Sequence, residues 1–382
     1  MDVAQIRQLT THWIDKLPGN ESTVVSGFGV WPLLALLAEV ADGPAREELT
    51  QVASGSYLDV PDTPDLRLAL GLWTRSDVPL QPGLLVPSAM RGILSGQEAV
   101  DAWVADRTGG LIDRMPVQID DSVLLLLASA LAVQTSWVLP FDSSPRGSAW
   151  WLTRRDPDLD SVQRVESSNG PLTVVTVIGE GEVDVRLIVG EKQGSRAEVL
   201  AAGLQAATGI PGSVLLAEAA PDSSPAPSVQ VASSTSPVPT VDLSMPSFEL
   251  DADHDLLDYP DVFGLRTATD QTRGHFPGLS PTPLAVGRAK QAVMARFSAK
   301  GFEAAAATAF SLRAGSARRP LPPAGKKLCV DLDGPFGFIA VHRPTGAPLV
   351  AGWVTEDAWR AVRTRTIATD AVPEHLWPQS IS

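Results

Sequence analysis

The sequence predicts an α+β protein, because helical patterns prevail early in the chain and strand patterns late, and no period repeats. Of the 382 residues, 44% are apolar and 19% are charged, as in ordinary globular proteins. Gly (31) and Pro (32) together stay below the roughly 25–30% that marks low-complexity chains. We therefore expect a sizeable packed core.

Four early segments carry helix signals. Residues 1–17 have apolar side chains at helical spacing, and Pro18-Gly19 ends the pattern. Trp31-Pro32 opens an apolar, buried helix that ends at Gly43, and Pro44–Ala53 forms a more polar one. Ser95-Gly-Gln-Glu98 has the form of a capping box and begins a helix that ends at Gly109-Gly110.

Strand patterns follow. Leu66–Trp73 has leucines at period two, which predicts a strand. Val123–Val133 is a run of Leu and Ala, and periodicity alone fits either a central strand or a buried helix. Leu172–Ile178 and Val183–Val189 flank Gly179-Glu-Gly181 and predict a hairpin. Ala197–Ala207 is helical, and the other strand candidates are Ser22–Val25, Val241–Leu250, Leu284–Phe297, Leu328–Asp331, Phe336–Val341 and Leu349–Val354.

Two segments lack periodicity. Pro221–Thr240 holds five Pro and six Ser, which predicts a flexible surface connection rather than a packed element. Arg313–Lys327 is rich in Gly, Pro, Ser and Arg, and loops of that length are usually functional or disordered.

Charge and cysteine content exclude several function classes. The net charge of −14 disfavours nucleic acid and anionic membranes as partners, because both need concentrated Lys and Arg. The single cysteine, Cys329, excludes an intrachain disulfide and a Cys-rich zinc site, and its apolar neighbours predict a buried, inert thiol. The N-terminus reads as an amphipathic helix rather than a signal peptide, so we expect a cytoplasmic protein, with secretion left open.

No pattern calls for catalysis. The five histidines show no metal-ligand spacing, and there is no G-x-S-x-G elbow or Walker loop. Gly27-Phe-Gly29 lacks the third glycine of a dinucleotide-binding turn, and carboxylate pairs such as Asp156/Asp158 and Glu180/Glu182 lie in polar loops. We expect no catalytic residues, no metal, no cofactor and no enzyme activity.

One alanine-rich segment stands out: Gly301-Phe-Glu-Ala-Ala-Ala-Ala-Thr-Ala309. Alanine is the best helix former, so a plain helical turn is one interpretation. The other follows from the preceding strand and the long loop after it. The segment resembles the reactive-loop hinge of the serpin family, whose usual form is Gly-Thr-Glu followed by small residues.

The resemblance runs collinearly over residues 1–357. The segments that carry it besides the hinge are Ser26 with Trp31–Gly43, Ala45-Arg-Glu-Glu-Leu49, Leu70-Gly-Leu-Trp73, Val100-Asp-Ala-Trp-Val104 with Thr108-Gly-Gly110, Leu127-Ala-Ser-Ala-Leu131, Trp137-Val-Leu-Pro-Phe-Asp142, Val241-Asp-Leu-Ser-Met-Pro-Ser-Phe248, Gly334-Pro-Phe-Gly-Phe338 and Ala351-Gly-Trp-Val354. The chain is similar to a divergent bacterial member, and the scarcity of Lys beside Arg fits a GC-rich bacterial source.

The resemblance implies one domain over residues 1–357, with three β-sheets, eight or nine helices and a reactive loop at about 300–327, followed by a tail at 358–382. It implies a metastable monomer that inhibits serine proteases, or cysteine proteases, as a suicide substrate. The target protease cuts the loop, which then inserts into the central sheet and traps the protease in a covalent complex. The alternative is a non-inhibitory serpin that acts as a binding or carrier protein.

Alternation along the hinge supports insertion. Written as a strand, one face is apolar apart from one hydroxyl and can be buried, whereas the other begins and ends with charge. The first face consists of Phe302, Ala304, Ala306, Thr308, Phe310 and Leu312, and the second of Glu303, Ala305, Ala307, Ala309, Ser311 and Arg313.

The sequence departs from the family pattern in three places. Phe302 replaces the usual Thr, and its bulk should delay insertion without forbidding it. Ala299 replaces the Glu usually found two residues before the hinge glycine. Of the polar residues that the family calls the shutter, Ser26 remains, while Gly29, Ser129 and Gln291 occupy the other positions; Trp137 matches the buried tryptophan of the breach.

Family spacing from Gly301 places the scissile bond at Gly315-Ser316. Glycine offers a specificity pocket little to bind, whereas Arg313, Arg318 or Arg319 would suit a trypsin-like protease, whose pocket carries an Asp. The other interpretation of these arginines is solvated surface charge. We predict cleavage within Arg313–Arg319.

Overall fold

The computed structural model describes residues 1–56, 63–82, 84, 86–87, 90–108, 110, 114–115, 117–120, 123–191, 194–206, 208–303 and 325–359. It confirms the α+β class, with three sheets. The described residues contain seven helices. Six of them are α1 (Val3–Lys16), α2 (Gly27–Val40), α3 (Gly43–Val52), α4 (Gln97–Thr108), α5 (Arg196–Gln205) and α6 (Gly212–Glu218), and the seventh is a single turn at 356–359. The resemblance implies eight or nine.

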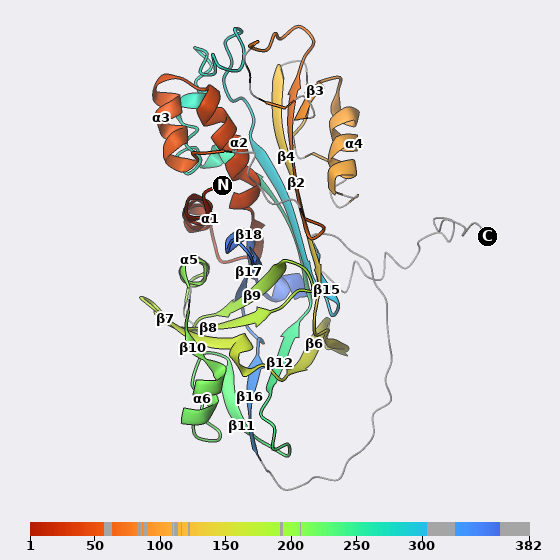
Figure 1. Cartoon of the computed structure of the whole chain (residues 1–382), viewed down its shortest axis with the longest axis vertical. Helices are drawn as coiled ribbons and strands as arrows, with labels where there is room; N and C mark the ends of the chain where they lie inside the picture. Colours follow the sequence, from red (N-terminus) through yellow and green to blue (C-terminus); the bar gives the residue numbers. More distant parts are fainter. Residues whose placement is uncertain are drawn as a thin grey trace, which may run out of the picture.

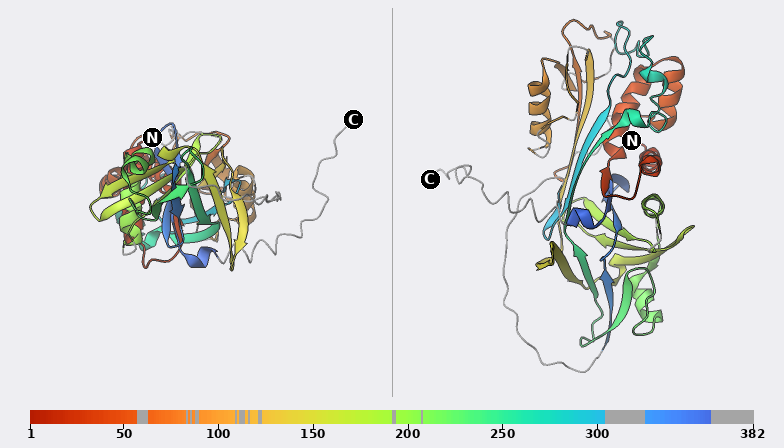
Figure 2. Two further views of the ribbon diagram at one scale, coloured as in Figure 1. Left: turned by 90° about the horizontal axis from the view of Figure 1, so that it is seen from below. Right: turned by 180° about the vertical axis from the view of Figure 1, so that it is seen from behind.

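A six-stranded sheet runs along the long axis of the molecule (Figure 1). Its strands in order are β13 (Phe248–Asp255), β14 (Lys290–Phe297), β15 (Gly301–Glu303), β4 (Leu125–Ser136), β2 (Leu66–Thr74) and β3 (Arg91–Ile93). Helices α2 and α3 lie on one side of this sheet and α4 on the other, as Figures 1 and 2 both show. On the α4 side, Val100 packs with Leu126 and Ala128 of β4. The sheet is therefore covered on both faces.

The other two sheets lie in the middle and lower parts of the molecule as it is drawn in Figure 1. The seven-stranded sheet has the order β1 (Thr23–Val25), β18 (Ala347–Val354), β17 (Phe336–His342), β9 (Val183–Val189), β8 (Gly170–Val177), β7 (Val162–Ser167) and β10 (Ile210–Pro211). The five-stranded sheet has the order β11 (Val229–Ser234), β16 (Gly325–Asp331), β12 (Val241–Pro246), β6 (Ala149–Asp156) and β5 (Asp142–Arg146). Short 3₁₀ turns occur at Leu159–Ser161, Leu256–Asp258 and Thr267–Thr269.

Most predicted elements form where expected, including the hairpin of β8 and β9. The ambiguous run at 123–133 is a strand, β4, whose residues alternate between the two covered faces of the sheet. Helix α2 begins before Trp31, because Ser26 caps it: the Ser26 hydroxyl accepts a hydrogen bond from the Gly29 N–H at 2.9 Å. Pro32 therefore lies inside the helix rather than at its start.

Three strand predictions need correction. The candidate at 241–250 is divided at Ser247 into β12 of the five-stranded sheet and β13 of the six-stranded sheet. The candidate at 284–297 begins at Lys290, because the backbone before it pairs with a loop instead: Leu284 accepts from His275 and Val286 donates to Ala268. Pro221–Thr240 is not merely a flexible connection, since it contains β11. The prolines of that segment lie outside the strand, where no ladder hydrogen bond is lost.

The helices of the described ranges include none that is both long and apolar enough to cross a membrane.

Candidate functional site

The six-stranded sheet is open along part of its middle. Strands β4 and β14 both flank β15, which has only three residues and pairs with Gln134–Ser136 on one side and Arg296–Phe297 on the other. Beyond β15, in the described part of the chain, Leu125–Val133 pairs only with β2, and Lys290–Ala295 only with β13. We call the gap between these two facing edges the strand slot.

A cavity of about 640 Å³ includes the strand slot and extends beyond it along the loop that precedes β14. Its walls are the two facing strands, and residues of α2, including Val30, Leu34 and Leu37, line it from one side of the sheet. Met115 and Val117, which follow α4, line it from the other side. Backbone N–H and C=O groups on unpaired strand edges are strong hydrogen-bonding groups, so this cavity suits an additional strand.

The first three residues of the predicted hinge already lie at one end of the slot. The Phe302 side chain is fully buried, and its ring centroid is 5.9 Å from that of Phe338. Gly301 lies so close to β4 that an added Cβ would be 2.3 Å from the carbonyl oxygen of Thr135. The protein thus accommodates the bulk of Phe302 within the sheet, and a glycine is required where the chain enters.

Trp137 supports this end of the slot. Its indole Nε1 donates a hydrogen bond to the Ser298 carbonyl at 3.0 Å, and its backbone N–H donates to Lys300 at 2.9 Å. Its ring centroid is 4.7 Å from that of Phe297. The tryptophan therefore holds the turn that connects β14 to β15.

The substitution of Ala299 for a glutamate leaves no charge at that position of the turn. An ion pair that sequence reasoning missed lies nearby: Arg296 of β14 and Glu249 of β13 are 2.9 Å apart, and the Glu249 side chain is only 6% exposed. The two residues are directly opposite in the antiparallel ladder. Their separation of 47 residues in sequence gave no local signal of this contact.

The four predicted shutter positions come together midway along the slot. Ser26 donates from its hydroxyl to the Leu349 carbonyl at 2.6 Å. The Gln291 side chain forms two hydrogen bonds with the Ser26 backbone, accepting from its N–H at 3.0 Å and donating to its C=O at 2.9 Å. Ser129 donates to the Gly29 carbonyl at 2.7 Å. Both walls of the slot are thereby tied to the start of α2, and we call these four residues the shutter cluster.

A third set of contacts spans the far end of the slot. Arg288, just before β14, donates to the Gln118 carbonyl and to the Asp120 carboxylate, both at 2.5 Å. Gln118 and Asp120 precede β4, so this arginine connects the beginnings of the two facing strands. No sequence pattern predicted the contact.

The remaining predicted site residues lie outside the described residues. They are Ala304, Ala305, Ala306, Ala307, Thr308 and Ala309 of the hinge, and the scissile-bond candidates Arg313, Gly315, Ser316, Arg318 and Arg319. Cys329 is only partly buried in β16, and burial raises the pKa of its thiol, which disfavours the reactive thiolate. Within the described ranges, no group of His, Cys, Asp and Glu side chains is arranged to hold a metal ion.

Comparisons with known proteins agree with this architecture. Residues 224–356 match the family model for serpins, described as serine protease inhibitors. No curated protein sequence matches the chain. The sequence match to the serpin family covers residues 224–356, and the solved structures described next show that the chain as a whole has the serpin fold.

Three solved serpin structures show the same fold over nearly the whole chain. Serpin48 of the insect Tenebrio molitor, described as highly specific, has a TM-score of 0.65 at 15% identity and covers 92% of this chain and 96% of its own. The thermophilic serpin tengpin in its native state has a TM-score of 0.64 at 15% identity, with 93% of both chains covered. Native protease nexin-1 with heparin has a TM-score of 0.65 at 16% identity, covering 92% and 97%.

Proposed function

We propose that this protein is a suicide-substrate inhibitor of serine proteases, or of cysteine proteases, that inserts its cleaved loop into the strand slot. The observation that carries the proposal is the strand slot itself. Its two walls are the same two strands, β4 and β14, that already pair with β15 at one end. The segment that would fill the slot follows β15 directly in the chain. A single chain suffices for this mechanism and performs no catalysis, so we propose a monomer.

The register of β15 supports the proposal. In the observed ladder, Glu303 is opposite Gln134 and Arg296. Continuing that antiparallel register places Thr308 opposite Ser129 and Gln291, which both belong to the shutter cluster. The only hydroxyl on the apolar face of the hinge would therefore meet the polar cluster of the slot.

The rest of the apolar face would meet apolar walls. In the same register, Ala304 falls opposite Val133 and Ala306 opposite Leu131, and small side chains enter between two strands with little steric cost. Burial of Phe310 and Leu312 would contribute roughly 1.5–3 kcal/mol each, besides the two new hydrogen-bond ladders. Insertion is therefore favourable once the loop is cut.

Insertion displaces whatever is attached to the cut end. Each inserted residue moves that end by ~3.3 Å along the sheet. A protease acylated at a residue within Arg313–Arg319 would travel the length of the slot and be pressed against the far end of the molecule. We propose that the resulting distortion of its active site stops deacylation.

The test is to mix the protein with trypsin-like and other serine proteases and to separate the products on denaturing gels. We expect a covalent band at the summed mass with at least one protease, and mass spectrometry of the C-terminal fragment should place its first residue within 314–320. Cleaved protein without a covalent band for every protease would refute inhibition.

The alternative function, a non-inhibitory binding or carrier protein, is favoured by one observation. The same 640 Å³ cavity has an apolar lining from α2 and can take an apolar ligand without any cleavage. An inhibitor and a carrier differ in one simple respect, since only the inhibitor gains thermal stability when its loop is cut.

A further inference from the structure

The cavity that includes the strand slot continues beyond it, toward the loop at 259–289 that precedes β14. There its walls are Phe276, Leu279 and Leu284 of this loop, together with Leu33 and Leu37 of α2. We call this part of the cavity the far lobe, because it lies at the end of the strand slot away from β15.

Leucines of β4 beside the cavity are less buried than their place in a covered sheet would require. Leu126 and Ala128 pack with Val100 of α4, so Leu125 and Leu127 point to the other face of the sheet, which α2 covers. Both of these leucines are only half-buried. The cavity accounts for this exposure, and an apolar ligand within it would bury both side chains.

Hydrogen bonds hold the loop wall of the far lobe in place. The Thr267 N–H and hydroxyl donate to the Glu48 carboxylate of α3 at 2.9 and 2.6 Å. The Val286 N–H donates to the Ala268 carbonyl at 2.8 Å. Figure 1 shows this loop passing beside α3 and reaching the start of β14. The far lobe therefore has a preformed wall, as small-molecule sites usually do.

The charged residues that line the cavity all have the same sign. They are Arg273, Arg288 and Lys290, which are all exposed, and no Asp or Glu is among the described lining residues. The whole chain has 44 acidic and 30 basic residues, so the lining differs from the composition of the chain. Apolar walls with exposed cations are complementary to an amphiphilic anion.

The three cations differ in their partners. Arg288 binds the Asp120 carboxylate at 2.5 Å, and Lys290 lies 3.9 Å from the Asp255 carboxylate. Arg273 forms no ion pair with a carboxylate in the described part of the chain. Its guanidinium can therefore bind an external carboxylate through two hydrogen bonds.

The acidic residue nearest to Arg273 in the sequence is engaged elsewhere. The Asp270 carboxylate accepts hydrogen bonds from the N–H and the hydroxyl of Thr272, at 3.0 and 2.7 Å. This carboxylate closes its own turn, and the Arg273 guanidinium lies beyond ion-pair distance of it.

We propose that the far lobe binds a long-chain fatty acid, with the hydrocarbon chain between the leucines of α2 and β4 and the carboxylate on Arg273. The cavity volume of about 640 Å³ lies within the roughly 300–1,000 Å³ that is typical of small-molecule sites. Binding requires neither cleavage nor insertion of the loop, so this site is independent of the proposed inhibition.

The experiment measures the binding of dodecanoate to the uncut, full-length protein by isothermal titration calorimetry, at ligand concentrations that form no micelles. The control ligand is dodecyltrimethylammonium, which has the same hydrocarbon chain and a cationic head group. We expect dodecanoate to bind and the control ligand not to bind. Absence of dodecanoate binding, or equal binding of the two ligands, would overturn the proposal.

Arg273→Gln tests the contact with the head group. It should weaken dodecanoate binding about tenfold, as expected for the loss of one charged hydrogen-bonded contact. The matched control is Arg266→Gln, because Arg266 is an exposed arginine of the same loop that binds Asp261 and does not line the cavity. This control should bind dodecanoate like the wild type. Equal affinities of Arg273→Gln and the wild type would refute the assigned head-group contact.

Leu33→Trp tests where the hydrocarbon chain lies. Leu33 is half-buried and lines the cavity, so the larger ring should occupy part of the far lobe and weaken dodecanoate binding. Leu17→Trp, at a half-buried leucine that follows α1 and lies outside the cavity, should keep the wild-type affinity. Circular dichroism verifies that both variants fold. Wild-type affinity in folded Leu33→Trp would contradict the assigned position of the chain, and if this variant does not fold, the comparison of Arg273→Gln with Arg266→Gln decides.

Discussion

Two sheets of the molecule differ in how completely their strands are paired. We call the seven-stranded sheet, which contains β17 and β18, the paired sheet, and the six-stranded sheet, which contains the strand slot, the open sheet. Every residue of β17 and β18 is buried, and each strand has a partner on both sides. Strands β4 and β14 have a partner on both sides only at the end where β15 enters. Strand β17 is paired along both edges, with β18 and β9, and β18 has β1 beside Ala351–Trp353. The comparison teaches that the chain pairs a central strand along its whole length in one sheet, and in the other leaves two facing strand edges unpaired beyond β15.

The sequences of the two regions explain the difference. Strand β17 and strand β18 are nearly continuous apolar runs, as expected for strands covered on both faces. The strand slot instead has the shutter cluster at its middle. In the sequence, a segment of small residues, Ala304–Ala309, directly follows β15. The following predictions test whether the conformational change that follows cleavage takes place at the strand slot and not in the paired sheet.

The largest effect is expected from Ala306→Asp. On insertion this position faces the apolar wall of the slot, where an unpaired charge is costly to bury. We expect cleavage by the target protease to continue while the covalent complex disappears from denaturing gels. The matched variant Ala305→Asp places the same charge on the other face of the hinge, two residues from Glu303, whose ladder partner Gln134 is exposed, and should keep more of the complex than Ala306→Asp. Equal complex yields in the two variants would contradict the assigned facing.

Phe302→Ala should lower the free energy of unfolding of the uncut protein by about 3 kcal/mol, because a fully buried aromatic ring leaves a cavity. Urea unfolding measures the change, and amide exchange at Phe302 and Glu303 should quicken with it. The conservative variant Phe302→Leu should cost less than about 1.5 kcal/mol. A loss below about 0.5 kcal/mol in Phe302→Ala would show that β15 contributes nothing to the uncut state.

Ser26→Ala should cost about 1–3 kcal/mol, since it removes a buried hydroxyl that donates to Leu349 and accepts from Gly29. The same substitution at Ser143, exposed on edge strand β5, should stay within about 0.5 kcal/mol. Thermal unfolding of the two variants side by side distinguishes them. Similar melting temperatures would mean that the shutter cluster does not stabilise the uncut sheet.

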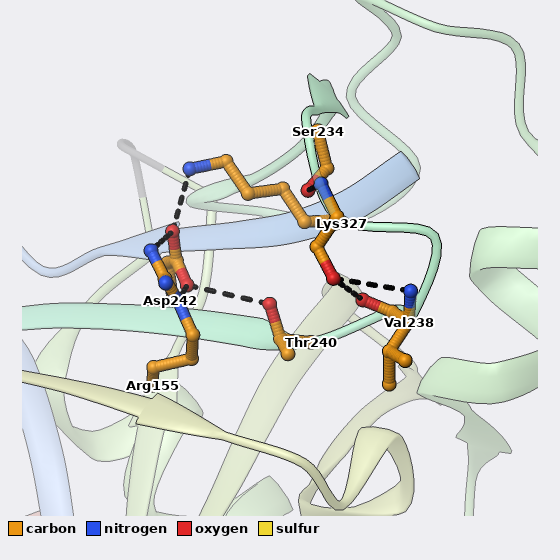
Figure 3. A network of polar contacts seen from close by, with 7 residues as sticks. Arg155, Ser234, Val238, Thr240, Asp242 and Lys327 are labelled. Atoms are coloured by element: carbon orange, nitrogen blue, oxygen red, sulfur yellow. Dashed lines mark hydrogen bonds and ion pairs between the residues drawn. The ribbon is translucent and has the colours of Figure 1, made fainter. Parts of the chain in front are cut away.

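The smallest expected effect is a pH dependence at Asp242 of β12, whose carboxylate accepts hydrogen bonds from Arg155 of β6 and from Lys327 of β16 (Figure 3). Partial burial of Asp242 opposes ionisation, but hydrogen bonds from Arg155 and Lys327 outweigh it and lower the pKa of the carboxyl group. A lowered pKa contributes stability that is present above the ordinary aspartate value of ~3.9 and is lost as the pH falls further. Unfolding measured from pH 6 downward should show this loss in the wild type, and Asp242→Asn should reduce it. An identical pH profile in the variant would exclude the contribution.

Much of the fold could be predicted, because its signals are local. The alternation in Leu66–Trp73, the hairpin glycines and the apolar periodicity of the first helix all lie within a few residues of one another. The resemblance then brought Ser26, Ser129 and Gln291 together across more than 250 residues, and the structure places them in one cluster. Periodicity alone would not have connected them.

The missed features have identifiable physical causes. The composition of Pro221–Thr240 concealed β11, whose two buried valines alternate in a segment otherwise rich in Pro and Ser. The sequence predicts a helix start at Pro32 because the actual cap, Ser26, precedes Gly27 and Gly29, and these two glycines weaken the helix signal. The contact of Arg288 with Asp120 joins residues 168 apart, for which a single sequence holds no signal. The scissile bond stays a prediction.

The central claim is that the strand slot accepts the cut loop, and one measurement tests it most directly. The loop is cut with a protease that cleaves within Arg313–Arg319, and thermal unfolding of the cut and uncut proteins is compared. A new strand paired on both sides, with Phe310 and Leu312 buried, should raise the melting temperature by about 10 °C or more. Equal or lower melting of the cut protein would show that the loop stays out and would contradict the account.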